Sequence, residues 1–480
     1  MFSKHFYQWS VPAILETLSK SLVIAISIFY LEKIEFGIMT ASMLIFTYHT
    51  FLSLGITDGL MIKLPGYYIK KQITKIINSL SISAIYISAI LILSNILILL
   101  IFISDRSNLF FITILLYGIA TVPYQFYYHY LLLNRFTYNF GVTKRARLLI
   151  VFLRIFLQIP LLLQFGLIGV VSGELIVYSV AALYIQYLSD LKLSKYFSFE
   201  NFKSLTFFGL PILIINIVGL ISATLEKLIA SIFLDFQAIA NIGTLTFIGS
   251  IFLIISSQLL SLFSQYSREF IVKKPSERVN LFGSYLAFIQ ISSLLYVIFS
   301  ALLFHLLDRF LIPNFAIQYT DIIIFFGLVF LLFYIRIILA GIINFLLILG
   351  ERSSITISHI LFISCSIIYL LVNILILNKS FNIEIFITSL VIGALFQSIF
   401  CFYIVFKLLK QTFGFIWIFL SIGQLIFLVS LLYSGIFSSW LFLGLAHILT
   451  FSILNFIFLT YTNLCTLPKN FLYLLNKEYM

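Results

Sequence analysis

Hydrophobic residues form long stretches along almost the whole of this chain, and charged residues are confined mainly to the short segments between them. Many stretches reach about 20 residues, the length that an α-helix needs to cross the hydrocarbon core of a bilayer. We therefore predict an all-α, polytopic membrane protein. We expect about fourteen transmembrane helices, over residues 11–30, 38–60, 78–103, 109–133, 146–165, 167–188, 205–225, 240–264, 281–304, 321–348, 355–377, 383–406, 414–433 and 440–461.

Two of these spans, 146–165 and 167–188, are separated only by Gly166 in the sequence LLQFGLIG. Glycine adopts backbone conformations that interrupt a helix at little steric cost. We therefore expect a tight turn at Gly166 between two antiparallel helices, and not one long helix.

The distribution of basic residues predicts the orientation of the helices. If the N-terminus is cytoplasmic and the sides alternate, 21 of the 29 Lys and Arg residues fall in cytoplasmic segments, five in outer segments and three within spans. Cytoplasmic loops of membrane proteins carry such an excess of basic residues. We therefore expect both termini in the cytoplasm. The outer loops are short, which argues against a membrane glycosyltransferase or polymerase with a catalytic outer loop.

Composition supports the membrane assignment and narrows the function classes. The chain has 480 residues, of which 62% are hydrophobic and 10% charged, whereas soluble domains are about 25% charged. A soluble enzyme, a disordered chain and a disulfide scaffold are excluded. The net charge of +12 is explained by the basic loops, so no nucleic-acid partner is expected. We expect no cleavable signal peptide, because Glu16 and Lys20 interrupt the first apolar segment.

A weak internal repeat relates the two halves of the chain. Pro12 and Pro211 open the first and seventh spans in similar sequences, and two further matches follow in the same order, at offsets of 199, 206 and 210 residues. The period is about six helices, and both copies begin in the cytoplasm. Parallel repeats of this kind form two lobes with a binding site between them. We predict an N-lobe over 1–200 (helices 1–6), a C-lobe over 201–410 (helices 7–12) and two extra helices with a cytoplasmic C-terminus over 411–480.

Ionisable residues inside the spans are the first candidates for function, because each costs about 2.5–3.5 kcal/mol at the centre of a membrane helix. The basic ones are Lys20, Arg154 and Arg336, and the acidic ones are Glu16, Asp58 and Glu174.

Glu16 and Lys20 lie four residues apart in the order that favours an ion pair on one helix face. A structural pair with a snorkelling lysine is one interpretation. The other is that this face lines a cavity in which Lys20 meets a substrate phosphate.

Arg154 and Arg336 lie near the middle of their predicted spans. Each either pairs with an acid on a neighbouring helix, such as Glu174, or faces a wet cavity. A planar guanidinium suits bidentate binding of phosphate in the second case.

Asp58 lies at the expected cytoplasmic end of the second span, between Gly55 and Gly59. A hinge role and a gating or proton-coupling role both remain open. Glu16, Asp58 and Glu174 are the candidates for coupling transport to H⁺ or Na⁺. No cofactor and no metal site is expected, because the six His and three Cys show no metal-ligand spacing.

The fourth span contains the sequence VPYQFYYHYLL, which places Gln125 and His129 on one helix face, and Tyr124 and Tyr128 on another. Aromatic rings with amide and imidazole groups suit stacking on sugars, although an interfacial aromatic belt gives the same pattern. Further polar cavity candidates are Gln258, Gln265 and Asn344. No nucleophile elbow, phosphate-binding glycine loop or zinc motif is present in the sequence, so we expect a protein that is not an enzyme.

The segment YLEKIEFGIMTASMLIFTYHTFLSLGITDGLMIKLPGYYIKK resembles the start of polysaccharide-biosynthesis flippases, including O-antigen repeat-unit flippases. These belong to the multidrug/oligosaccharidyl-lipid/polysaccharide exporter superfamily. In the second half, FGLPILIINI and LEKLIASIFL resemble the start and end of the family's seventh helix. The likeness covers residues 1–410 in outline. Its motif positions here are Glu35, Phe36, Gly37, Gly55, Asp58, Gly59, Phe208, Gly209, Pro211, Glu226 and Lys227.

This resemblance implies a flippase that moves an undecaprenyl-pyrophosphate-linked oligosaccharide, an O-antigen or capsule repeat unit, across the bacterial inner membrane by alternating access. It would interact with the lipid bilayer and the lipid-linked glycan. Its protein partners would be a polysaccharide polymerase and a chain-length regulator. Two helices beyond the usual twelve leave a lipid II flippase as an alternative. A drug or small-cation exporter of the same superfamily would need an acidic cavity, and the intramembrane charges here lean basic.

Overall fold

The computed structural model describes residues 2–48, 52–101, 109–137, 139–195, 197–247, 326–376 and 383–409, with the single positions 249, 289 and 296. Every regular element within these ranges is a helix, and eight helical stretches are long and apolar enough to cross a membrane. The predicted all-α, polytopic class is confirmed. The predicted spans 240–264, 281–304, 414–433 and 440–461 lie wholly or largely outside the described residues, so the count of fourteen stays a prediction.

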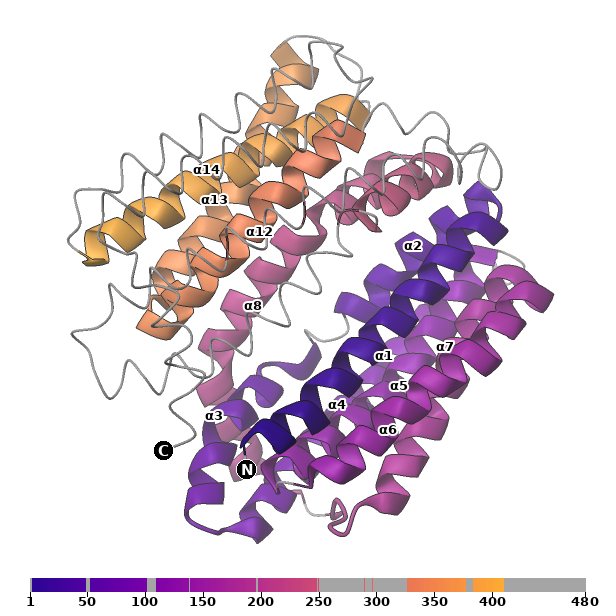
Figure 1. Ribbon diagram of the computed structural model, residues 1–480, viewed down its shortest axis with the longest axis vertical. Coiled ribbons are helices and arrows are strands. Elements are labelled where there is room, and N and C mark those ends of the chain that lie inside the picture. The colour runs from indigo at the N-terminus through magenta and orange to yellow at the C-terminus, as the bar shows by residue number, and fades with distance from the viewer. Residues whose placement is uncertain are drawn as a thin grey trace. The chain divides into compact units, whose positions relative to one another are not determined.

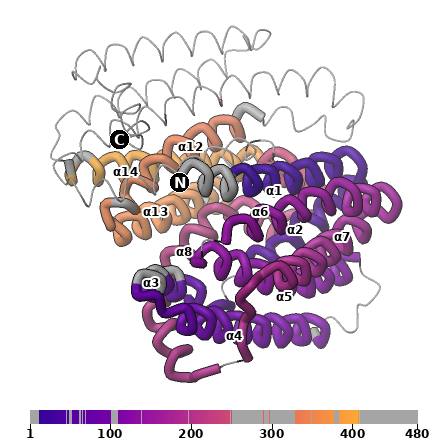
Figure 2. The backbone as a smooth tube through the Cα atoms, turned by 60° about the horizontal axis from the view of Figure 1, so that its bottom comes forward, coloured from indigo at the N-terminus to yellow at the C-terminus, as the bar shows by residue number. Residues whose placement is uncertain are grey.

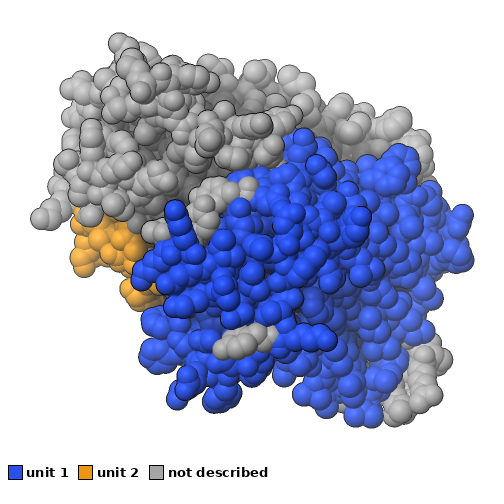
Figure 3. All heavy atoms as spheres, turned by 90° about the horizontal axis from the view of Figure 1, so that it is seen from below, with its two compact units in different colours: residues 1–244 blue, residues 245–480 orange. Residues whose placement is uncertain are grey.

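The chain divides into two compact units, residues 1–244 and 245–480 (Figure 3). The first unit includes the helix predicted as the seventh span, which the sequence repeat would assign to the second lobe. The lobe boundaries inferred from the repeat stay a prediction.

Helices α1 to α8, labelled in Figure 1, belong to the first unit. Helix α5 lies at its centre and packs against α2, α4 and α7, while α1 packs against α6 and α8 packs against α3. Figure 2 shows α1, α6 and α7 running alongside one another. The helices are α1 (Phe2–Tyr30), α2 (Lys33–Tyr48), α3 (Ile56–Ile69), α4 (Ile73–Ile101), α5 (Leu109–Phe136), α6 (Phe140–Leu153), α7 (Ile159–Leu188) and α8 (Phe199–Phe233).

Three helices of the second unit are described: α12 (Phe326–Leu349), α13 (Arg352–Leu371) and α14 (Ile383–Leu409). They pack against one another, most extensively α13 against α14. A π-helical turn, Val372–Ile376, extends α13.

The expected single span over 38–60 is wrong, because the structure contains two helices there. Helix α2 ends at Tyr48 and α3 begins at Ile56. Leu54 and Gly55 between them have φ values of 46° and 80°, which belong to the left-handed region and interrupt a right-handed helix. Apolar composition carries no signal for such a break. Helix α3 then continues to Ile69, through a stretch that the sequence suggested was loop.

The predicted turn at Gly166 is confirmed. Its φ of 58° and ψ of −134° lie outside the helical region and separate two arms within residues 159–188. The arms are antiparallel, because Gly169 approaches Leu161 while Gly173 approaches Gln158, further from the turn on both sides. The glycines allow the backbones to come close, as small residues do between membrane helices.

A π-helical turn, Arg154–Gln158, joins α6 to the first arm of this hairpin. Pro160 lies two residues after the end of this turn. Proline cannot donate a backbone hydrogen bond and crowds the preceding turn, and a widened turn relieves that conflict. Both ends of the π-helical turn, Arg154 and Gln158, are buried, so this local irregularity brings two polar side chains into the helical bundle.

Candidate functional site

The hairpin places Arg154 inside the first unit with 1% of its surface exposed. Its Nη1 donates to the backbone carbonyl of Glu16 at 2.9 Å, and its Nη2 donates to the hydroxyl of Tyr178 at 2.9 Å. Nη2 also lies 3.5 Å from Oε1 of Glu174. Of the two alternatives for Arg154, the structure shows the ion pair with Glu174, and the guanidinium connects α1 with the second arm of the hairpin.

Glu174 is the centre of this polar network. Its Oε2 accepts a hydrogen bond from Nε2 of Gln158 at 2.9 Å, and its Oε1 faces both Arg154 and the ammonium of Lys20, which is 3.9 Å away. Its side chain is 8% exposed. A buried carboxylate needs such partners, because an unpaired charge in this environment is strongly destabilising.

Lys20 differs from its neighbours in being accessible. Its side chain is 35% exposed, against 1% for Arg154. The ammonium also lies 5.4 Å from the centre of the Phe46 ring on α2, within the range of a cation–π contact. Lys20 therefore presents a positive charge at the edge of the network, held by one carboxylate and one aromatic face.

Of the two interpretations of Glu16 and Lys20, the ion pair on one face of α1 is not formed, and each charge has its partner on another helix. Glu16 Oε2 lies 3.7 Å from Nε of Arg147 on α6, and Lys20 pairs with Glu174 on α7. Sequence spacing describes only contacts within one helix, whereas packing of α1 against α6 and α7 brings partners from other helices within reach.

The network holds more positive than negative charge. It contains three basic side chains, Lys20, Arg147 and Arg154, and two acidic ones, Glu16 and Glu174. One positive charge is therefore in excess among these five side chains. Sequence reasoning missed Arg147, Gln158 and Tyr178 as members. The available signal was helical spacing: Gln158 follows Arg154 by four residues, as Tyr178 follows Glu174.

An aromatic cluster adjoins the network. The ring of Tyr124 on α5 lies 4.9 Å from the ring of Tyr178 and 5.0 Å from that of Phe46. Tyr128 stacks next to Tyr124, with ring centroids 6.4 Å apart. Phe46, Tyr124 and Tyr128 are half-buried, and Phe46 is the member of the cluster that contacts Lys20.

Gln125 and His129 point into the protein interior. His129 is fully buried, and both ring nitrogens have partners: Nε2 lies 2.8 Å from the Ser83 hydroxyl and Nδ1 lies 2.7 Å from the Gln125 carbonyl. Gln125 is also buried. These contacts favour a packing role for the pair, and leave Tyr124 and Tyr128 as the partly exposed members of the predicted set on this helix.

Asp58 lies in the first turn of α3 and accepts a hydrogen bond from Nδ2 of Asn216 on α8 at 2.7 Å. The two helices cross at Gly55, Gly59 and Gly209, where an added Cβ would overlap the facing backbone. This contact places Asp58 at a close helix crossing, apart from the network around Glu174.

Two predicted residues lie in the second unit. Arg336 on α12 is half-buried, and its guanidinium carbon lies 5.2 Å from the Phe333 ring and 5.8 Å from the Phe362 ring. Asn344 donates to the carbonyl of Ala340 at 2.8 Å. Gln258 and Gln265 lie outside the described residues. Among described residues, no group of three or more His, Cys, Asp or Glu is placed to hold a metal ion.

The fold is similar to those of several solved structures of membrane transporters. A structure of the lipid II flippase MurJ in an inward closed conformation is similar at 14% identity, with a TM-score of 0.62, over 94% of this chain and 99% of that chain. An outward-facing multidrug resistance MATE family transporter of the MOP superfamily is similar at 15% identity, with a TM-score of 0.57, over 88% of this chain and 96% of that chain.

An inward-facing multidrug resistance MATE family transporter of the same superfamily is similar at 14% identity, with a TM-score of 0.55, over 84% of this chain and 98% of that chain. At these identities the likeness concerns the fold. No family model matches the sequence, and no curated protein matches it.

Proposed function

We propose that this protein is a flippase that carries an undecaprenyl-pyrophosphate-linked oligosaccharide, an O-antigen or capsule repeat unit, across the bacterial inner membrane. Transport would proceed by alternating access and without catalysis. The fold supports a transporter, since its similar structures include a lipid II flippase and multidrug exporters.

The observation that carries the proposal is Lys20, an accessible cation at the edge of a network in which positive charge is in excess. An anion approaching Lys20 meets an ammonium that, among the residues the structure describes, forms an ion pair with a single carboxylate, at 3.9 Å. A pyrophosphate has the charge to compete for it. The neighbouring rings of Phe46 and Tyr124 give sugars an apolar face to stack on.

Arg154 supports this site indirectly. With 1% of its surface exposed and with donors engaged by Glu16, Glu174 and Tyr178, its guanidinium holds the carboxylate that orients Lys20. We propose Lys20 and, in the second unit, Arg336 as phosphate contacts, and Arg154 as a positioning residue.

Coupling to H⁺ or Na⁺ is a second part of the proposal. Glu16 is its leading candidate in the network, because Arg147 contacts it at the long distance of 3.7 Å and its side chain is 18% exposed. Asp58 and Glu174 are the others. Export into vesicles that continues at the same rate when the ion gradients are collapsed would exclude coupling.

The excess of cations favours a transporter of an anionic cargo over an exporter of drugs or small cations. A glycan polymerase is the least favoured of these three functions. A lipid II flippase shares the pyrophosphate and the lipid, so it is the main alternative. A comparison of the transport rates of lipid II and of an O-antigen precursor by the reconstituted protein would distinguish the two functions.

The central experiment replaces Lys20. In cells whose surface glycan depends on this protein, Lys20→Ala should abolish export of the repeat unit at unchanged protein level, and Lys20→Arg should keep part of it. Lys70→Ala, at an exposed position at the end of α3, is the matched control and should export normally. Normal export by Lys20→Ala would refute the proposed phosphate contact.

A further inference from the structure

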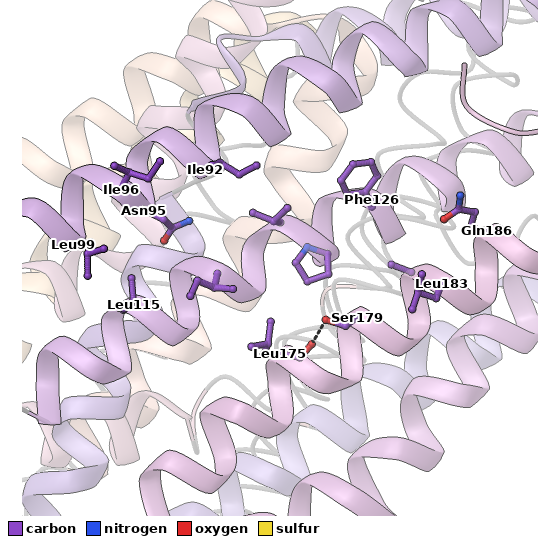
Figure 4. A pocket seen from close by; sticks show the side chains of 14 residues that line it. Ile92, Asn95, Ile96, Leu99, Leu115, Phe126, Leu175, Ser179, Leu183 and Gln186 are labelled. Atoms are coloured by element: carbon purple, nitrogen blue, oxygen red, sulfur yellow. Dashed lines mark hydrogen bonds between the residues drawn. The ribbon is translucent and has the colours of Figure 1, made fainter. Parts of the chain in front are cut away.

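A second binding feature lies on the first unit, formed by helices α4, α5 and α7. It is an open groove of about 740 Å³. Figure 4 shows Ile92, Ile96 and Leu99 of α4, Leu115 and Phe126 of α5, and Leu175 and Leu183 of α7 along it. Nearly all of its lining is apolar, and several lining side chains are exposed, including Leu183 at 68%.

Such a groove would face hydrocarbon, because the helical stretches that contain α4, α5 and α7 are each long and apolar enough to cross a membrane. The α7 wall extends from Leu175 to Gln186. Eleven residue steps of 1.5 Å give a length of about 17 Å. One leaflet of a bilayer contributes about half of the 30 Å hydrocarbon core, so this wall matches one leaflet in length.

A loop crosses one end of the groove. It leaves α7 at Ser189, passes α5, where the Leu193 amide donates to the Tyr130 hydroxyl at 3.4 Å, and reaches α4, where the Ser194 amide donates to the Ser81 hydroxyl at 2.8 Å. Ser189 itself accepts from Asn134 of α5 at 2.7 Å. The segment that follows the groove near Gln186 is therefore fixed to the same three helices.

This loop carries positive charge at the mouth of the groove. The ammonium of Lys192 donates to the backbone carbonyls of Gln186, a residue that lines the groove, and of Tyr187. Lys192 and Lys195 are both exposed. Basic side chains near the surface of a bilayer attract anionic lipid with about 1 kcal/mol each. By the predicted topology this is the cytoplasmic end.

We propose that the groove is a binding site for an anionic phospholipid of the cytoplasmic leaflet, with one acyl chain between α4, α5 and α7 and the phosphate beside Lys192. The apolar lining, the one-leaflet length of its α7 wall and the basic loop at one end support this occupant together. The site is separate from the charge network, since Leu175, Ser179 and Leu183 line a different face of α7 from Glu174 and Tyr178.

The test uses native mass spectrometry of the purified full-length protein, without any transported substrate, so that its outcome is independent of the proposed flippase activity. Phosphatidylglycerol and phosphatidylcholine with identical chains are offered at equal concentration. We expect one retained phosphatidylglycerol. Lys192→Gln should reduce the preference for phosphatidylglycerol about five-fold, which corresponds to one surface lysine.

Two variants test the chain-binding part. Ser179→Trp would fill the groove and should abolish retention of the lipid. Leu183→Trp changes a residue at its open edge, where folding is least affected, and should weaken retention. Leu93→Trp, at a position on α4 that is exposed but does not line the groove, is the control.

Retention that is unchanged by both groove variants would overturn the proposal. Equal retention of the two phospholipids, or displacement of phosphatidylglycerol by a polyprenyl phosphate at equal concentration, would overturn the assignment to an anionic phospholipid.

Discussion

Arg154 and Glu174 face each other across a single helical hairpin, with Nη2 3.5 Å from Oε1. The arginine is at the start of the π-helical turn and the glutamate is on the returning arm beyond Gly166. Neither charge is in water, so each depends on the other. The pair organises a network that leaves only Lys20 substantially accessible.

The first prediction concerns this pair. Arg154→Met should destabilise the protein by about 3–5 kcal/mol, because it leaves a buried carboxylate without its main partner. Adding Glu174→Gln should restore much of the loss, since the remaining group is neutral and can still accept from Gln158. Thermal unfolding of the purified variants in one detergent measures both effects. Additive losses in the double variant would show that the two side chains are not coupled.

The turn of the hairpin gives a second prediction. Gly166→Ala should cost about 1–2 kcal/mol, because φ is positive there. Gly169→Ala should cost about 1–3 kcal/mol through overlap with the Leu161 carbonyl. Gly66→Ala, in a helix with open space around it, is the matched control and should be neutral or stabilising. Equal unfolding temperatures for all three variants would contradict the close packing of the arms.

A third prediction separates Tyr128 from His129. Tyr128→Ala should lower export of the glycan with little effect on stability, because the ring is partly accessible beside Tyr124. His129→Ala should lower stability by about 1–3 kcal/mol, because it leaves the buried Ser83 hydroxyl unpaired. Export per folded molecule and unfolding temperature together distinguish the two. If His129→Ala lost export at normal stability, the imidazole would have a direct role.

Arg336 provides a fourth prediction. Its guanidinium lies near the rings of Phe333 and Phe362, and lysine does not reproduce the stacking of a planar guanidinium. Arg336→Ala should block export, and Arg336→Lys should be impaired more than Lys20→Arg. Arg352→Ala, exposed at the start of α13, is the control. Export assays at equal protein level decide the matter, and full export by Arg336→Ala would remove this residue from the site.

Features that depend on local sequence could be predicted, and features that depend on packing could not. Gly166 was recognisable because a lone glycine separates two apolar stretches. Two isolated charges on consecutive helices made the pairing of Arg154 with Glu174 one of two alternatives, and the sequence did not decide between them. The partners of Glu16 and Lys20 depend on how α1 packs against α6 and α7, which helical spacing does not encode. The break at Gly55 is equally invisible to hydropathy, because its neighbours are apolar.

The same distinction applies to the fourth predicted span. Sequence spacing correctly grouped Gln125 with His129 and Tyr124 with Tyr128. Which of the two groups remains accessible was decided by the neighbouring helices, since Ser83 of α4 occupies the histidine face. Spacing defines faces, and only tertiary contacts tell which face is covered.

The hairpin at Gly166 also bears on biogenesis. A lone guanidinium entering hydrocarbon costs about 2.5–3.5 kcal/mol on insertion scales. Because its counter-charge follows only 20 residues later on the adjoining arm, the two can neutralise one another while the nascent chain is still leaving the insertion machinery. The arms would then enter the lipid as a single, electrically balanced piece, before any later helix has been synthesised.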